Sequence, residues 1–326
     1  MENIILVTGA AGFIGSHLVE RLLDAGYRVV GLDNFDEYYQ PAIKRGNIQS
    51  IGARDRFTMI EGDIRDTALI NRLFLEHRIG LVAHLAARAG VRPSIQHPAL
   101  YQDVNIGGTI NLLEASRSNG IRQFLFTSSS SVYGAGASLP FSEDVKLDYP
   151  TSPYAASKLA AELFCRTYHH LYNLPVTVIR PFTVYGPRQR PEMAISLFTG
   201  QIEAGEEISI FGDGTSKRDY TFVSDIVDGM LRALTSKNRG FEIFNLGDSR
   251  PVVLSSLIHI IEAAVGKKAR IKYLPEQKGD MPITYADISR AGKYLGYEPK
   301  VTIEEGISRF VAWRRQPVNA VRHDYA

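Results

Sequence analysis

The chain has 326 residues, of which 44% are hydrophobic and 22% are charged, and its formal net charge is +2. These values are typical of a globular protein whose core is large enough for a fold in two parts, and the small net charge gives no reason to expect a nucleic acid as partner. One cysteine, Cys165, excludes an intrachain disulfide and, together with the lack of a long apolar run, favours a cytoplasmic protein without a membrane partner.

The first predicted strand, residues 4–7, is a short unbroken apolar run, as expected of a strand buried on both faces of a parallel sheet. Apolar residues at helical spacing follow over residues 13–23, and the turn between contains Gly9, Gly12 and Gly15. Such glycines allow a tight turn, the approach of a diphosphate to the backbone and close packing of the helix, whose start offers free N–H groups. This context predicts a dinucleotide-binding loop, whereas a plain turn would need only one or two of the glycines.

The second predicted strand, residues 27–33, ends on Asp33. An acid at this place accepts hydrogen bonds from both hydroxyls of an adenosine ribose and repels a 2′-phosphate, so it favours NAD over NADP as the cofactor. The alternative is that Asp33 only caps the turn or helix that follows. The glycine turn upstream favours the cofactor interpretation.

Strands and helices continue to alternate through the first half of the chain. The apolar patterns predict further strands at residues 56–60, 81–87, 124–127 and 176–180, one helix that ends near residue 74, and helices over about 98–117 and 154–172. Repeated strand–helix units after a glycine turn predict an α/β fold with a doubly wound, Rossmann-type parallel sheet.

Candidate catalytic groups follow the strand 124–127, where open α/β sheets bind their ligands. A serine-rich loop there includes Ser129, and Tyr154 and Lys158 lie one helical turn apart on one helix face. An ammonium beside the phenol, helped by a positively charged nicotinamide, lowers the pKa of a tyrosine from its ordinary value near 10. We therefore predict Tyr154 as the base and Ser129 as a hydrogen-bond partner of the reacting oxygen. The alternative is a surface pair on a helix beside an ordinary polar loop.

These residues together resemble a known family, the extended short-chain dehydrogenase/reductases that act on nucleotide sugars. The resemblance covers essentially the whole chain. It implies an NAD-binding Rossmann domain over residues 1–180 and a smaller C-terminal α/β lobe that binds the nucleotide sugar over residues 181–326, with some segments returning to the Rossmann sheet. The catalytic residues that it implies are Tyr154, Lys158 and Ser129, and no metal is implied. The NAD-binding residues that it implies are Gly9, Gly12, Phe13, Ile14, Gly15, Asp33, Asn34, Asp63, Ile64, Leu85, Ala86, Ala87, Asn105, Thr127, Tyr154, Lys158 and Phe182.

The second part of the chain contains segments that resemble the signatures of the substrate lobe. A diphosphate needs cations, for which arginine offers a fork geometry, a uracil needs an apolar wall such as Phe211, and a ribose needs an acid such as Asp280. Each segment has the alternative of a turn with solvated charge, and Arg188 is a candidate for that alternative. The substrate-binding residues that the resemblance implies are Arg88, Ser128, Ser129, Thr183, Arg190, Met193, Ala194, Phe211, Arg218 and Asp280.

Within this family, residues 33–39, 86–92 and 183–191 are most similar to the corresponding stretches of bacterial UDP-glucuronate 4-epimerases. Thr183 stands where UDP-glucose 4-epimerases and UDP-xylose synthases have Asn, and Ser131 stands where decarboxylases and 4,6-dehydratases have Glu. The resemblance therefore implies a UDP-sugar substrate, epimerisation at C4 of UDP-glucuronate through a 4-keto intermediate, and Thr183 and Arg190 beside the sugar carboxylate.

Three alternatives to this function stay open. Two are enzymes of the same fold, a UDP-glucuronate decarboxylase and a UDP-glucose 4-epimerase. The third is a non-catalytic NAD-binding scaffold, which is expected to have lost Tyr154, Lys158 or the serine. Relatives dimerise through the helices that correspond to residues 98–117 and 154–172, so we expect a homodimer.

Overall fold

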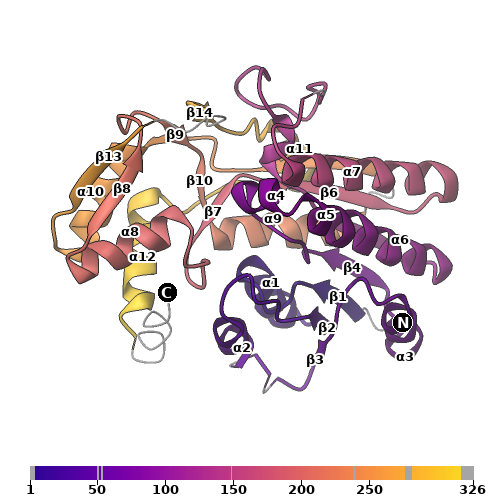
Figure 1. Ribbon diagram of the computed structural model, residues 1–326. Helices are drawn as coiled ribbons and strands as arrows, with labels where there is room; N and C mark the ends of the chain where they lie inside the picture. The colour runs from indigo at the N-terminus through magenta and orange to yellow at the C-terminus, as the bar shows by residue number, and fades with distance from the viewer. Residues whose placement is uncertain are drawn as a thin grey trace.

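The computed structural model describes residues 4–49, 51–52, 54–147, 149–237, 240–275 and 281–316. Among these residues, seven parallel strands form one sheet in the order β11-β6-β5-β4-β1-β2-β3 (Figure 1). The predicted doubly wound sheet is confirmed. Its order reverses beside β1, which places a ligand crevice at the carboxyl ends of the central strands. The strands are β1 (Ile4–Thr8), β2 (Arg28–Asp33), β3 (Phe57–Glu61), β4 (Leu81–His84), β5 (Gln123–Thr127), β6 (Val176–Pro181) and β11 (Phe241–Leu246).

Helices cover both faces of this sheet because successive strand side chains point to opposite sides. Leu6 and Phe124 pack with apolar residues of α3, α6 and α7, whereas Ile5 and Leu125 pack with those of α1 and α9. The helices are α1 (Phe13–Asp24), α3 (Thr67–His77), α6 (Gly108–Ser118), α7 (Pro153–Tyr172) and α9 (Val223–Thr235). There are two further helices, α2 (Pro41–Gln49) and α4 (Val91–Gln96), in stretches for which the sequence analysis predicted no helix.

The fourth strand is shorter than predicted, since it ends at His84 rather than residue 87. Its neighbour β1 ends at Thr8, where Gly9 turns with a φ of 70°. Beyond this point the backbone of Ala86 donates a hydrogen bond to the Thr8 side chain, with 3.2 Å between N and Oγ1. Residues 85–87 therefore form a loop over the glycine turn instead of continuing the strand.

The helix predicted over residues 98–117 is interrupted. It consists of α5 (Pro98–Tyr101), a π-helical segment, η1 (Gln102–Gly107), and α6. Such segments lack a sequence signature in the apolar spacing and often occur at functional sites. Within η1, Asn105 is buried and faces the loop after β4.

The C-terminal lobe stands beside the sheet at its carboxyl ends (Figure 1). It contains small sheets, β10 with β7, β12-β9-β14, and β13 with β8. In contrast, β11 pairs with β6 in the large sheet, and α9 packs against one face of that sheet. These two segments come from the second half of the chain but belong to the layers of the large sheet. The helix α11 (Ser289–Leu295) also packs against β11 and α9. The lobe elements are β7 (Thr183–Tyr185), α8 (Ala194–Ala204), β8 (Glu207–Phe211), β9 (Lys217–Arg218), β10 (Tyr220–Phe222), β12 (Val252–Val253), α10 (Leu254–Val265), β13 (Arg270–Leu274), β14 (Ile283–Thr284) and α12 (Ile303–Arg314).

Cys165 lies on α7 as a free, fully buried thiol. Across the residues that the structure describes, no helix has the length and apolarity needed to span a membrane. Those same residues contain no cluster of His, Cys, Asp or Glu side chains suited to a metal ion.

Candidate active site

The glycine turn after β1 has two positions that only glycine fits. A Cβ on Gly9 would lie 2.8 Å from the backbone nitrogen of Ala86, and a Cβ on Gly15 would lie 2.8 Å from the carbonyl carbon of Gly9 and closer still to its oxygen. Gly12 differs, because a Cβ there would meet only the Gly9 oxygen, at 3.2 Å. The space beside Gly12 is otherwise open, at the start of α1, where free N–H groups attract an anion.

Asp33 lies at the end of β2, directly beside this turn. Its carboxylate accepts hydrogen bonds from the backbone N–H of Ala11 at 3.0 Å and of Phe35 at 2.9 Å. Burial raises the pKa of Asp33, while the two backbone N–H groups and the charge of Lys44 oppose that rise. Each oxygen therefore keeps lone pairs for further donors, such as ribose hydroxyls.

A pocket extends from Asp33 across the carboxyl ends of β1, β2 and β4. The side chain of Asn34 donates to Asp63 at 2.8 Å, and Arg65 donates to both oxygens of Asp63. These hydrogen bonds lower the pKa of Asp63 to about 2, so this acid is ionised and fixed. The residues that line the pocket are Gly9, Leu32, Asp33, Asn34, Gly62, Asp63, Ile64, Ala86, Ala87 and Val104.

Beneath the pocket, buried polar side chains hold the loop after β4. His84 lies between Thr8, at 2.7 Å, and Thr109, at 3.0 Å, and burial lowers its pKa to about 3, so the ring is neutral. The side-chain amide of Asn105 accepts a hydrogen bond from the backbone N–H of Arg88 at 2.7 Å and donates one to the backbone carbonyl of Arg88 at 3.0 Å. The same amide also donates to Ser157 of α7 at 2.9 Å. Asn105 therefore fixes the loop from behind.

Tyr154 and Lys158 lie in the first turns of α7, which begins after the cap Ser152. The Lys158 ammonium donates to the carbonyl of Thr127 at 2.8 Å, and burial lowers its pKa to about 8. Burial raises the pKa of Tyr154, while a hydrogen bond from Ser129 and the charge of Arg190 lower it. That Lys158 lowers this pKa stays a prediction, and the groups that lower it in the structure are Ser129 and Arg190.

Two hydroxyls at the end of β5 are left for a ligand. The side-chain oxygens of Thr127 and Ser128 are buried and have no hydrogen-bond partner among the described residues. Next to them, Ser129 accepts from the N–H of Ser131 at 3.1 Å, and its hydroxyl lies 3.1 Å from the Ser131 hydroxyl. The site thus has two unpaired hydroxyls among the described residues and, beside them, the pair of Ser129 and Ser131.

Two arginines contact the ring of Tyr38. The guanidinium carbon of Arg88 lies 4.8 Å from the centre of the Tyr38 ring, and that of Arg190 lies 5.6 Å from it. Each arginine also has a carboxylate partner, Asp36 for Arg88 and Glu192, at 3.2 Å, for Arg190. The sequence analysis missed Tyr38, Asp36 and Glu192, although two of them lie within the stretch 33–39 that it singled out.

The remaining residues predicted for the sugar site lie where the chain enters the C-terminal lobe, at the starts of β7 and α8. Thr183 begins β7, where its N–H donates to the carbonyl of Asp219 at 3.1 Å. Met193 caps α8 and its sulfur accepts from Arg190 at 3.3 Å, and Ala194 is the first residue of that helix. Phe182 is buried, with its ring packed against those of Tyr133 and Phe141.

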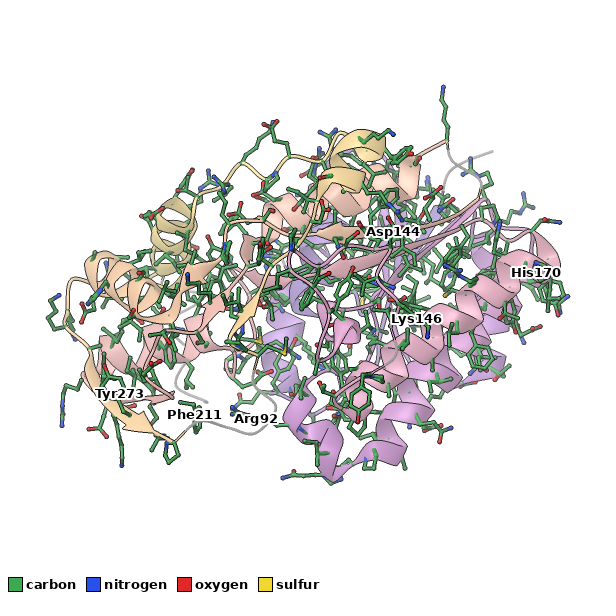
Figure 2. The ribbon with its side chains drawn as sticks, turned by 90° about the horizontal axis from the view of Figure 1, so that it is seen from above. Arg92, Asp144, Lys146, His170, Phe211 and Tyr273 are labelled. Carbon is green, nitrogen blue, oxygen red and sulfur yellow. The ribbon has the colours of Figure 1, made fainter. Side chains whose placement is uncertain are left out.

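The residues predicted for the nucleotide lie farther into the lobe. Phe211 ends β8, and the Arg92 side chain from α4 reaches across to it, with 5.0 Å between the guanidinium carbon and the ring centre (Figure 2). Arg218 lies on β9 and donates to the carbonyl of Lys217 at 2.9 Å. Asp280 falls outside the described residues. The structure thus brings Ser129, Tyr154 and Arg190 together, and it places Phe211 and Arg218 on separate lobe strands.

Comparison with known proteins gives a consistent result. Residues 5–247 match the model of the "NAD dependent epimerase/dehydratase family". A UDP-glucuronate 4-epimerase of Thermodesulfobacterium geofontis is 44% identical over 97% of this chain and 98% of its own. A crystal structure of the UDP-glucuronic acid 4-epimerase of Bacillus cereus, in complex with UDP-glucuronic acid and NAD, superposes with a TM-score of 0.90 at 39% identity, covering 98% of this chain and 99% of that one. A UDP-glucose 4-epimerase of Thermotoga maritima with UDP-glucose gives 0.87 at 35% identity, covering 96% and 98%.

Proposed function

Since this chain belongs to the NAD dependent epimerase/dehydratase family, we propose that it interconverts UDP-glucuronate and UDP-galacturonate by epimerisation at C4, with NAD as its cofactor. The observation that carries the proposal is that Ser129 and Arg190 lie close enough to the half-buried Tyr154 to lower the pKa of its phenol. Two of the proteins compared above, those of Thermodesulfobacterium geofontis and Bacillus cereus, are named as 4-epimerases of UDP-glucuronate.

The residues present fit a dinucleotide. Gly12 leaves room for a diphosphate at the start of α1, and the Asp33 carboxylate has lone pairs for the adenosine ribose. Thr127 has a buried hydroxyl free of other partners among the described residues, on the strand end next to Lys158. NAD bound along this line would supply the hydride chemistry, by which C4 of the sugar is oxidised and then reduced from its other face.

Tyr154 takes the proton from the sugar 4-hydroxyl and later returns a proton to the 4-keto oxygen. Ser129 lies beside the phenol of Tyr154. It donates a hydrogen bond to the same sugar oxygen and assists the proton transfer. The charge of Arg190 favours the phenolate and opposes the effect of burial, and NAD, when bound, would add the positive charge of its nicotinamide ring. Between the two steps the 4-keto sugar turns about its phosphate linkage and presents its opposite face.

The intermediate is a β-keto acid that readily loses CO₂, so the site must hold the carboxylate without assisting that loss. Thr183 and Arg190 provide a hydroxyl and a guanidinium for the carboxylate. At the position where decarboxylating relatives have Glu, Ser131 offers a hydroxyl that is engaged with Ser129 and cannot act as a base near neutral pH. These features favour the epimerase over the decarboxylase.

The test is to incubate the purified protein with UDP-glucuronate, without added NAD, and to identify the products by NMR. We expect UDP-galacturonate as the main product, with at most traces of pentose and no accumulated NADH. Mainly UDP-pentose would assign the decarboxylase instead. Turnover of neutral UDP-hexoses alone would assign the glucose epimerase, and bound NAD without any turnover would assign the scaffold.

We also propose a homodimer in the cytoplasm. The solvent face of α7 carries apolar side chains that no described element covers, with exposed fractions of 59% for Leu163, 38% for Phe164, 58% for Leu171 and 46% for Tyr172. Apolar side chains gathered on one exposed helix favour burial against a second copy. Light scattering at micromolar concentration decides the oligomeric state, and a monomer would contradict the proposal.

A further inference from the structure

The turn between β7 and α8 is tied to α1, the helix that starts at the glycine loop. The carbonyl of Pro187 accepts a hydrogen bond from His17 at 2.8 Å. Arg188 donates to both carboxylate oxygens of Glu20, at 2.8 and 2.9 Å. The Arg188 and Glu20 side chains are only 14% and 26% exposed. A two-bond fork between planar groups fixes orientation as well as distance, so the pair sets the position of the turn on the helix.

The turn is also closed within itself. Arg188 has a φ of 65°, which an L-residue rarely adopts, and its fork with Glu20 holds it there. The backbone N–H of Gln189 donates to the carbonyl of Gly186, and the Gln189 side chain donates to the carbonyl of Val184, both at 3.1 Å. Residues 186–190 therefore form one hydrogen-bonded unit, which Glu20 holds on α1 through the Arg188 side chain and His17 holds through the Pro187 carbonyl.

Arg190 ends this unit and faces the other way, toward the sugar site. Its guanidinium lies against the Tyr38 ring and contacts Glu192 and Met193. Its charge acts on Tyr154, so a shift of the turn changes both the contact of Arg190 with a sugar and its effect on the phenol.

We propose that Glu20 is a positioning residue that, from the dinucleotide-binding helix, holds the 186–190 turn and thereby keeps Arg190 in place at the sugar site. Glu20 itself contacts none of the groups assigned to cofactor or substrate. The inference rests on the proposed function for the identity of the sugar, because a UDP-uronate is the ligand that needs Arg190. According to this proposal, α1 holds the turn 186–190 in addition to forming part of the dinucleotide site.

The experiment compares Glu20→Gln with Asp24→Asn in the NAD-loaded protein. Asp24 lies one turn farther on α1 and pairs with Arg54 at 2.6 Å, where both side chains are largely exposed, so it controls for loss of one helix carboxylate. We measure KM and kcat for UDP-glucuronate, the dissociation constant of UDP-glucuronate by calorimetry, the NAD content and the unfolding temperature. We expect Glu20→Gln to raise KM and the dissociation constant roughly 2- to 30-fold, a range typical of residues that act through others. NAD content should match that of Asp24→Asn, which should bind as the wild type does.

A second variant guards against a folding defect. Arg188→Gly removes the same fork from the side of the turn, and glycine adopts a φ of 65° without strain. It should raise the dissociation constant as Glu20→Gln does, and the double variant should be no weaker than either single one. Equal binding by Glu20→Gln and Asp24→Asn, or additive effects in the double variant, overturn the inference. If the wild type binds UDP-glucuronate without converting it, the proposed function fails while the calorimetric comparison still decides the role of Glu20.

Discussion

Two glycines of the dinucleotide loop should respond in opposite ways to the same added methyl group. In Gly15→Ala the new Cβ would lie 2.8 Å from the carbonyl carbon of Gly9 and nearer to its oxygen, and neither atom can move without shifting the turn. In Gly12→Ala the nearest atom is 3.2 Å away, and the φ of −70° and ψ of 176° at this position suit alanine. The fold therefore opposes the first change and tolerates the second.

The magnitudes follow from these contacts. Overpacking against fixed backbone costs about 1–3 kcal/mol or somewhat more, so Gly15→Ala should lower the free energy of unfolding by roughly 3 kcal/mol. Gly12→Ala should change it by less than about 1 kcal/mol, because only a helix-cap preference is lost. Its Cβ instead fills the place of the diphosphate. Loss of one charge-assisted hydrogen bond, about 1.5–3 kcal/mol, weakens NAD binding roughly 10- to 100-fold.

The assay is denaturant unfolding of the NAD-free proteins together with calorimetric titration of NAD. Gly12→Ala should unfold close to the wild type and bind NAD weakly, whereas Gly15→Ala should unfold early. Gly229→Ala serves as a packing control on α9, since its Cβ would meet the side chains of Leu246 and Tyr297, neither of which lines the pocket. If Gly12→Ala keeps full NAD affinity, the diphosphate does not approach Gly12 and the assignment of this loop is wrong.

Three further predictions concern the sugar site. Tyr154→Phe should reduce turnover to background while NAD still copurifies, because only the proton acceptor is lost; product formation and the absorbance of bound cofactor check this, and measurable turnover would exclude Tyr154 as the base. Arg190→Gln should move the acid limb of the pH–rate profile to higher pH, because Arg190 lowers the pKa of Tyr154 and its loss leaves less phenolate at a given pH; an unchanged limb would show that Arg190 does not act on the phenol. Thr183→Ala should raise the fraction of decarboxylated product by loosening the carboxylate, which NMR of the product mixture measures; a product ratio equal to that of the wild type would remove Thr183 from the carboxylate site.

The parts of the fold that the sequence predicted are those set by local patterns. Strands buried on both faces must be apolar throughout, so the runs at residues 4–7 and 124–127 reveal β1 and β5 directly. The glycine turn was equally visible because its spacing follows from backbone contacts that exclude a Cβ. Residues 85–87 misled the prediction, since they are as apolar as β4, yet the neighbouring strand β1 ends at Thr8 and the chain turns away at Gly9.

Features that depend on distant contacts were not visible in the sequence. The π-helical segment keeps a helical apolar spacing, and only the hydrogen bonds of Asn105 to the loop after β4 explain its position. Tyr38 gave no local signal, because its two arginines come from residues 88 and 190. The anchoring of Arg188 by Glu20 spans 168 positions. The sequence left open that Arg188 is only a solvated charge in a turn, whereas the structure shows it in a mostly buried ion pair with Glu20.

The acids around the sugar site bear on the outcome of the reaction. Decarboxylation is promoted by a free acid or base near the keto acid, and four acids at or beside the site are already engaged. Asp36 pairs with Arg88, and Glu192 pairs with Arg190. Asp33 accepts two backbone N–H groups, and Asp63 is held by Arg65. This agrees with our proposal of Tyr154 as the proton-transferring group, since a single such group suits a reaction that removes and restores one proton at the same oxygen.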